Sequence, residues 1–381
     1  MKNLKFRSMQ TAVLPQQDKP VLSGLPWEAL REILKPLPEF RVNQVFQWIP
    51  RGIASFQQMT DLALPLREDL EKRFSLYSTV IAGRMEDPDG TVKLSIRLHD
   101  GAYIEAVLLV DGAGRKTACL STQAGCPLGC VFCKTGTRGL TRNLNSGEIF
   151  EQFLHLRSIR PDIANIVFMG MGEPLLNLPE LRKFLAVLTD TRGIGFSKRR
   201  ITLSTSGIIA GIRDLADQGP ALGLALSLTT GDAALRSRLM PVSWCNPLPK
   251  LKEVLYYYQQ RQGRRITLEA VLLGGINTRH EDSEALAAFA QGLDVVVNLI
   301  PWNPVDAMVF EGRSLREPSS RELAAFTRRL EQRGLKVTQR LRKGRSIAGA
   351  CGQLGGASQE GYSRREAVYT EGSVVSARIN A

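Results

Sequence analysis

The stretch GCPLGCVFCKTG, residues 125–136, contains three cysteines with the spacing C-x3-C-x2-C: Cys126, Cys130 and Cys133. Three thiolates so close together can wrap one metal centre, and the flanking glycines let the backbone approach it. A structural zinc site normally has four protein ligands, and none of the chain's three histidines lies at a zinc-finger spacing from the trio. A [4Fe–4S] cluster is held by thiolates, and three of them would leave one iron open. The pattern favours the cluster, with zinc as the alternative.

From residue 165 onward, apolar stretches typical of strands alternate with amphipathic stretches typical of helices. This alternation predicts an α/β fold, with a parallel sheet and helical crossovers. The expected strands cover residues 165–172, 199–207, 223–228, 265–273, 295–301 and 335–340, and the expected helices cover residues 179–190, 208–218, 248–261, 281–292 and 319–334.

Polar residues recur at the carboxyl ends of several of these strands or directly after them: Gly172-Glu173, Ser204, Ser227 and Asn303. Each taken alone is ordinary turn chemistry. Because the carboxyl ends of the strands of a βα barrel meet on one face, their recurrence in register favours a shared site there.

The remaining sequence divides by composition. Residues 1–20 are expected to be a flexible lead-in, residues 21–77 a small helical accessory domain, and residues 78–111 a β-rich connecting segment. Residues 112–345 would form the core that contains the cysteine motif, and residues 346–381 a C-terminal segment with a polar tail.

The chain is strongly basic, with 50 Lys and Arg against 37 Asp and Glu and a formal net charge of +13. Residues 313–345 alone contribute 11 basic and 3 acidic side chains. Such a run is often only a solvated helix face, but this concentration favours contact with the phosphates of a nucleic acid.

Two classes of protein are excluded by composition. No run of 18 apolar residues is present, so we expect no membrane-spanning helix. Six cysteines in 381 residues are too few for a disulfide scaffold. We therefore expect a cytoplasmic protein, in which clustered cysteines bind metal or perform redox chemistry.

The cysteine motif, followed by a βα series with a Gly-Glu-Pro turn, resembles the radical S-adenosylmethionine (SAM) superfamily. The resemblance extends to five motifs in order: ACLSTQAGCPLGCVFCKTGTRGLTRNL (118–144), FMGMGEPLLN (168–177), RITLSTSG (200–207), VNLIPWNP (297–304) and ACGQL (350–354). Together with the N-terminal LPEFRVNQVFQWIPRG (37–52), they look like the RlmN/Cfr family of RNA adenosine methyltransferases. This implies a partial (βα)6 barrel, a [4Fe–4S] cluster on Cys126, Cys130 and Cys133, and SAM.

The resemblance also implies three catalytic residues. Cys351 would carry a methyl group taken from one SAM, and a second SAM would supply the radical, so two are used per turnover. Cys119 would resolve the protein–RNA link by forming a disulfide bond with Cys351. Glu105 matches the family's proposed proton acceptor.

The SAM contacts implied by the resemblance are Gly172, Glu173, Ser204, Ser227, Thr229 and Asn303. Thr229 stands where the family has a histidine and could supply only a hydroxyl group. In a second departure, Ser346 replaces an aspartate close to Cys351. Both departures bear on the identity of the substrate.

The activity expected from this resemblance is methylation of an adenosine carbon, C2 rather than C8, in structured RNA: 23S rRNA and also tRNA. The target base would have to be single-stranded, looped or flipped out to reach the site. An external electron donor such as flavodoxin or ferredoxin would be required. The alternatives are a radical SAM enzyme acting on a different RNA or a non-RNA substrate, and a zinc-bearing, non-enzymatic RNA-binding protein.

Overall fold

A single mixed sheet forms the centre of the protein. The computed structural model describes residues 19–305, 307–340 and 343–356. The strands of this sheet are β1 (Val80–Glu86), β2 (Val92–Arg97), β3 (Tyr103–Val110), β4 (Lys116–Cys119), β7 (Ile163–Phe168), β8 (Ile201–Thr205), β9 (Gly223–Ser227), β10 (Ile266–Leu272), β11 (Val295–Pro301) and β14 (Val337–Gln339). They lie in the order β1-β2-β3-β4-β7-β8-β9-β10-β11-β14.

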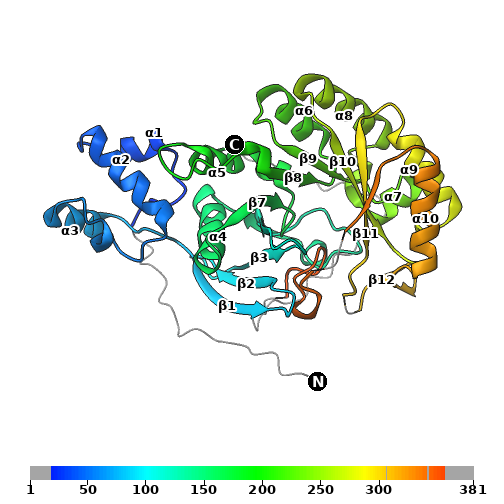
Figure 1. Cartoon of the computed structure of the whole chain (residues 1–381), viewed down its shortest axis with the longest axis horizontal. Helices are drawn as coiled ribbons and strands as arrows, with labels where there is room; N and C mark the ends of the chain where they lie inside the picture. The colour runs from blue at the N-terminus through cyan, green and yellow to red at the C-terminus, as the bar shows by residue number, and fades with distance from the viewer. Residues whose placement is uncertain (1–18, 306, 341–342, 357–381) are drawn as a thin grey trace.

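The part of the sheet from β4 to β14 is parallel. Its crossovers contain the helices α4 (Ser146–Ile159), α5 (Leu178–Thr189), α6 (Ile209–Gln218), α7 (Ala233–Leu239), α8 (Leu248–Gln262), α9 (His280–Ala290) and α10 (Ser320–Gln332). Figure 1 shows these helices along the outside of the curved sheet. This arrangement confirms the predicted α/β fold with a partial (βα)6 barrel. None of the helices among the described residues is long and apolar enough to cross a membrane.

Alternate residues of a strand lie on the same face. One face of β10 is apolar and fully buried through Leu268, Ala270 and Leu272, whereas Glu269 and Val271 on the other face line a cavity. The register places the strand ends near one another: Ser227 at the end of β9 is aligned with Glu269 of β10, and the last residues of β10 and β11, Leu272 and Pro301, are aligned with each other. The alignment brings the carboxyl ends of neighbouring strands together at one edge, as the sequence predicted.

The part of the sheet from β1 to β4 is antiparallel. Strand β4 joins the two parts, since it pairs antiparallel with β3 and parallel with β7. In Figure 1 the antiparallel strands extend the sheet toward the segment that contains Cys351.

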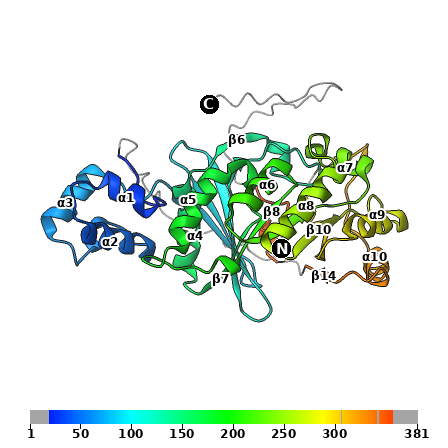
Figure 2. The same ribbon diagram turned by 90° about the horizontal axis from the view of Figure 1, so that it is seen from above.

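The helices expected between residues 21 and 77 are present as α1 (Trp27–Ile33), α2 (Glu39–Trp48) and α3 (Leu64–Arg73). They pack around a small apolar core that includes Leu30, Val45 and Leu70, each fully buried. Figures 1 and 2 show this group to one side of the barrel, next to α4 and α5.

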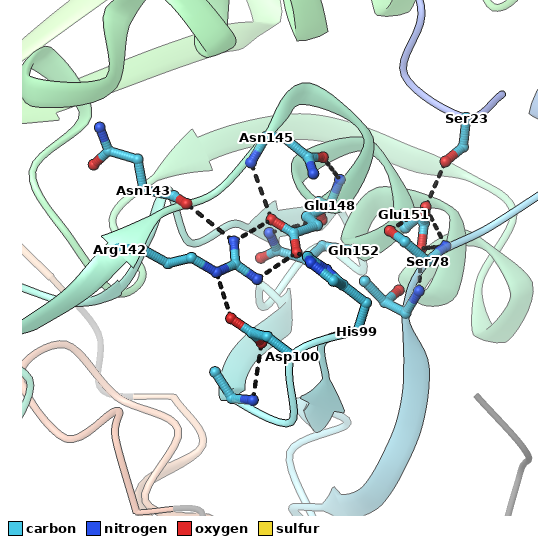
Figure 3. A network of polar contacts seen from close by, with 12 residues as sticks. Ser23, Ser78, His99, Asp100, Arg142, Asn143, Asn145, Glu148, Glu151 and Gln152 are labelled. Atoms are coloured by element: carbon cyan, nitrogen blue, oxygen red, sulfur yellow. Dashed lines mark hydrogen bonds and ion pairs between the residues drawn. The ribbon is translucent and has the colours of Figure 1, made fainter. Parts of the chain in front are cut away.

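Two buried carboxylates on α4 connect these helices and the antiparallel strands to the barrel (Figure 3). Glu151 accepts hydrogen bonds from the hydroxyl group of Ser23 and from the backbone amides of Ser78 (2.9 Å) and Thr79 (2.7 Å). Glu148 accepts two from Arg142, at 2.7 and 2.8 Å. Ionised groups are rarely fully buried without such partners, so α4 fixes where the neighbouring segments attach.

Several elements were not predicted from the sequence. Helix α4 was missed, although Asn145 and Glu148 form a capping box at its start, a pattern that can be read in the sequence. The strands β1 and β4 and the short hairpins β5 (Gln123–Gly125)–β6 (Leu140–Asn143) and β12 (Val309–Phe310)–β13 (Arg313–Ser314) were also missed. Most of these are four residues or fewer, too short for a periodic pattern. Residues 1–18 of the predicted lead-in and 357–381 of the predicted C-terminal segment lie outside the described residues.

Candidate active site

The three-cysteine loop is held closed at its base by the β5–β6 hairpin. The amide of Cys126 donates to the carbonyl of Gly139 (2.9 Å), and the amide of Cys133 donates to the carbonyl of Cys130 (3.1 Å). Gly125 has a φ of +87°, and a Cβ placed there would lie 2.0 Å from the carbonyl oxygen of Gly139. This glycine is therefore required for the turn that starts the loop.

The thiols of this loop lie in an environment that disfavours their ionised form. Burial raises the pKa of each, that of Cys126 to about 12, and for Cys130 the neighbouring thiols raise it further. Thiolates are the form that binds metal, so a positively charged group is needed to stabilise them here. Among the described residues, no three His, Cys, Asp or Glu side chains are grouped around a position for one metal ion.

The loop faces an open cavity at the carboxyl ends of the parallel strands, with about 940 Å³ of space that includes its opening to solvent. Besides the three cysteines and the Gly172-Glu173 turn, the cavity is lined by Ser204, Ser227, Glu269, Ile300, Asn303 and Cys351. The structure thus brings together the cysteine motif and most of the predicted SAM contacts.

The Gly-Glu-Pro turn is built around a buried carboxylate. Glu173 is 2% exposed, and its carboxylate accepts hydrogen bonds from the amides of Ser206 (2.8 Å) and Leu175 (3.1 Å). Burial raises the pKa of Glu173, and these hydrogen bonds oppose the rise. Gly172 has a φ of +100°, and a Cβ there would lie 2.5 Å from the side chain of Gln123. The turn can therefore place an acceptor group beside the cysteine loop.

The neighbouring strand ends supply hydroxyl and carboxylate groups. The hydroxyls of Ser204 and Ser227 are 3.4 Å apart, and Ser204 donates to Glu269 at 3.4 Å. Glu269 was not singled out from the sequence, although a carboxylate within the apolar strand RITLEAVLL is unusual. It is 5% exposed and lies 3.7 Å from the guanidinium of Arg340.

Two buried polar atoms at these strand ends have no hydrogen-bond partner among the described residues: Asn303 Oδ1 and Thr229 Oγ1. The amide nitrogen of Asn303 donates to the carbonyl of Cys351 (3.0 Å), which leaves its oxygen free for a ligand in the cavity. Thr229 adopts a φ of +63°, which is rare for a β-branched residue. It does not line the cavity, so the structure does not place it with the other predicted SAM contacts.

Cys119 and Cys351 share a second cavity, of about 530 Å³, with Met169 and Arg340. Cys351 also lines the first cavity, so it lies where the two meet. Burial raises the pKa of Cys119 to about 12, with a smaller contribution from Cys351, while Arg340 opposes the rise. Both cysteines are free thiols, so the predicted disulfide bond is not supported by this structure.

Glu105 lies outside both cavities. It is 2% exposed on β3, and its carboxylate forms an ion pair with Lys93 (3.1 Å). It also accepts hydrogen bonds from the amides of Gly355 and Gly356, the latter at 3.2 Å. The structure therefore connects Glu105 to the segment that contains Cys351 rather than to the cavity walls.

Much of the basic C-terminal stretch takes part in ion pairs within the protein. Arg316 pairs with Glu322, Arg333 with Glu284, Arg340 with Glu269 and Arg345 with Glu317. These arginines were predicted as candidates for RNA contact, and their local pairing reduces the charge they offer to a phosphate. The sequence did not reveal the pairing of Arg333 and Arg340, because their acidic partners Glu284 and Glu269 lie on other elements.

Comparison with known proteins first shows which broad class of protein the chain is similar to. Residues 120–287 match the model of the Radical SAM superfamily, and residues 22–76 match that of the Ribosomal RNA large subunit methyltransferase N-terminal domain. A radical SAM methyltransferase from Sphaerobacter thermophilus has a similar structure, with a TM-score of 0.83 and 37% identity over 88% of this chain and 99% of that one. Membership of this superfamily implies a [4Fe–4S] cluster and SAM.

The family follows from the curated relatives. A probable dual-specificity RNA methyltransferase RlmN of Treponema denticola is 48% identical over 337 residues, covering 88% of this chain and 96% of that protein. The dual-specificity RNA methyltransferase RlmN of Anaeromyxobacter dehalogenans is 39% identical, covering 92% and 95% of the two chains. The chain belongs to the RlmN family of radical SAM RNA methyltransferases. The loop of three thiols and the adjoining cavity fit the cluster and the SAM that this class uses.

Proposed function

We propose that this enzyme methylates C2 of an adenosine in structured rRNA and tRNA, with Cys351 as the carrier of the methyl group. The position of Cys351 carries this proposal, because its side chain borders both the cavity of the cysteine loop and the cavity that contains Cys119. A carrier must face the source of the methyl group on one side and the group that releases the product on the other.

Cys126, Cys130 and Cys133 would hold the cluster, and Glu173, Ser204, Ser227 and Asn303 would hold SAM. When bound, the cluster and two SAM molecules supply the methyl group and a 5′-deoxyadenosyl radical. The adenine carbon is electron-poor, so a radical route avoids the need for it to act as a nucleophile. An external donor such as flavodoxin or ferredoxin would supply the electron.

Cys351 would accept the methyl group by displacement, since a thiolate is a good nucleophile. Once a hydrogen atom has been taken from that S-methyl group, its carbon would bond to the adenine carbon. The adduct would then lose one electron to the bound cluster, and the proton of the base, leaving a methylene bridge between the sulfur and the base. To release the product, the sulfur of Cys119 would attack the sulfur of Cys351. The S–S bond forms as the S–C bond breaks, and the carbon takes the electron pair and a proton. Glu105 would accept the proton that leaves the base, which requires its carboxylate to become free of its present partners.

These thiols must be reduced at the start of each cycle, which suits a reducing cytoplasm. Arg340 and Lys343 both line their cavity, and Cys351 and Glu269 raise the pKa of Arg340. A guanidinium beside two thiols stabilises whichever is ionised.

The test is nucleoside mass spectrometry after an anaerobic reaction with reconstituted enzyme, reductant, methyl-labelled SAM, and unmodified 23S rRNA and tRNA. Labelled 2-methyladenosine in both RNAs is the expected product. Labelled 8-methyladenosine would overturn the choice of carbon. Formation of 5′-deoxyadenosine without a labelled base would favour a different RNA or a non-RNA substrate, and would turn attention to Thr229 and Ser346.

A further inference from the structure

Residues 343–356, called here the Cys351 segment, contact two separate parts of the molecule. On one side lies the barrel. Asn303 donates to the carbonyl of Cys351 (3.0 Å), the amide of Lys134 donates to that of Gly352 (2.8 Å), and the hydroxyl of Thr135 donates to that of Leu354 (2.8 Å). These three bonds all reach backbone carbonyls of residues 351–354.

On the other side lie the antiparallel strands. In the turn between β1 and β2, Asp89 accepts a hydrogen bond from the amide of Gly344 at 3.1 Å. Asp87 accepts two from Ser346, from its amide at 3.1 Å and from its hydroxyl at 2.5 Å. The turn and the segment are more than 250 residues apart in the chain, so these contacts belong to the tertiary structure alone.

A buried ion pair extends the same contact across Cys351. Lys93 on β2 donates to the carbonyl of Ala348 at 3.3 Å and pairs with Glu105 on β3 at 3.1 Å; the two side chains are 8% and 3% exposed. Glu105 in turn accepts from the amides of Gly355 and Gly356. One pair of opposite charges thus holds the segment before and after the cysteine.

The path of the segment needs these contacts because its backbone is not relaxed. Ala348 adopts a φ of +48°, in the left-handed region that residues with a Cβ rarely occupy. Gly344 has a φ of +65°, and a Cβ there would lie 2.7 Å from the side chain of Thr91 in the β1–β2 turn. The segment therefore lies directly on the turn, in a conformation that its own sequence does not favour.

We propose that Asp87 and Lys93 are positioning residues for Cys351. They hold its backbone at the junction of the two cavities through bonds to Ser346, Ala348 and Glu105 rather than to Cys351 itself. The inference rests on the proposed role of Cys351 as the methyl carrier. It also gives a role to Ser346, which replaces the family's aspartate: a serine can donate to Asp87, whereas an aspartate would bring a second carboxylate against the first.

The experiment compares Asp87→Ala, Asp87→Asn, Ser346→Asp and the exchanged pair Asp87→Ser with Ser346→Asp. Asp111→Ala is the matched control, since Asp111 also lies in a hairpin turn but the bonds of its carboxylate among the described residues stay within that turn, to Ala113 and Arg115. Two quantities are measured on the reconstituted enzyme. One is amide hydrogen exchange at residues 350–353, which Asp87 does not contact, and the other is the rate at which SAM methylates Cys351 without RNA.

For Asp87→Ala and Ser346→Asp we expect exchange at residues 350–353 to be roughly five- to tenfold faster than in the wild type. Methylation of Cys351 should be slower by a similar factor. This size of effect corresponds to the loss of one or two exposed hydrogen bonds to a charged group. Asp87→Asn, which keeps an acceptor, and the exchanged pair should recover most of both. Iron content and melting temperature should match those of Asp111→Ala.

Exchange in Asp87→Ala that equals the wild type would overturn the inference. So would a failure of the exchanged pair to recover, because the contact itself would then not be what matters. The exchange measurement needs no SAM or RNA, so it separates the two proposals. If the segment loosens as expected while wild-type Cys351 is never methylated, the proposed function fails and the positioning contacts stand.

Discussion

The two groups of cysteines are held in different ways. Cys126, Cys130 and Cys133 lie in one short loop, closed by hydrogen bonds between residues 126–139 of that same loop. Cys119 and Cys351 come from distant parts of the chain, and Cys351 is held by side chains of β2, β3 and the β1–β2 turn. The first group is closed mainly by bonds within its own loop, whereas the second depends on the whole sheet. Removal of a thiol from the loop should therefore act first on the metal centre, and changes in the antiparallel strands should act first on the carrier.

The largest effect is expected at the loop. Cys126→Ala removes one of three cluster ligands, and a two-thiolate remnant should not retain a stable cluster. We expect loss of the iron absorbance and no detectable methylated RNA. Cys245→Ala is the control, because Cys245 is an exposed free thiol that lines neither cavity. Full activity of Cys126→Ala would remove the loop from the mechanism.

The next two variants separate the members of the second group. Cys351→Ala should keep its iron and form no RNA adduct, because the methyl carrier is missing. Cys119→Ala should still form the adduct but not release it, so a covalent protein–RNA band should accumulate on a denaturing gel. Normal turnover by Cys119→Ala would contradict its resolving role.

A smaller effect is expected from the ion pair beneath the Cys351 segment. Lys93→Met leaves the carboxylate of Glu105 buried without its cation, which typically costs about 3 kcal/mol of stability. Chemical denaturation should show this loss. The double variant Lys93→Met/Glu105→Gln should recover at least a third of it, because no charge is then left unpaired. Equal stability of the single and double variants would mean that burial of the charge is not the cause.

The same difference between local and long-range contacts decides how much of the fold and of the site could be predicted from the sequence. The cysteine loop, the parallel strands and the residues after them were predicted, because each is specified by residues close together in the chain. The surroundings of Glu105 were not, since its partners Lys93, Gly355 and Gly356 meet it only once β2 and β3 have paired and the Cys351 segment has docked. Nor did the sequence show that Thr229 is absent from the cavity lining, because its positive φ depends on the turn after β9.

The smallest effect is expected from His155 on α4, the helix to which segments from distant parts of the chain are attached. Burial lowers the pKa of His155 to about 4 from 6.5, and its ring lies 2.9 Å from the hydroxyl of Thr79. Between these pKa values the unfolded chain binds more protons, so stability falls as the pH falls. From pH 7 to pH 5 we expect a loss of about 2 kcal/mol from this group. Urea unfolding at both pH values should show it.

The matched variant for that prediction is His155→Gln, which cannot take up a proton in this range and keeps a polar side chain near Thr79. Its stability should change less between pH 7 and pH 5 than that of the wild type. An equal change in both proteins would place the titrating group elsewhere.

Most of the bonds that seat the Cys351 segment end on its backbone, although Arg345, Ser346 and Gln353 also bond through their side chains. Asn303, Lys134, Thr135, Lys93 and Glu105 each bond to a main-chain carbonyl or amide of residues 348–356. A surface that binds a segment through its backbone places few demands on the side chains of that segment. Residues 348–356 should therefore be open to transplantation: a homologous stretch with other side chains around the cysteine could be grafted onto this scaffold, provided that Ser346 keeps its contact with Asp87.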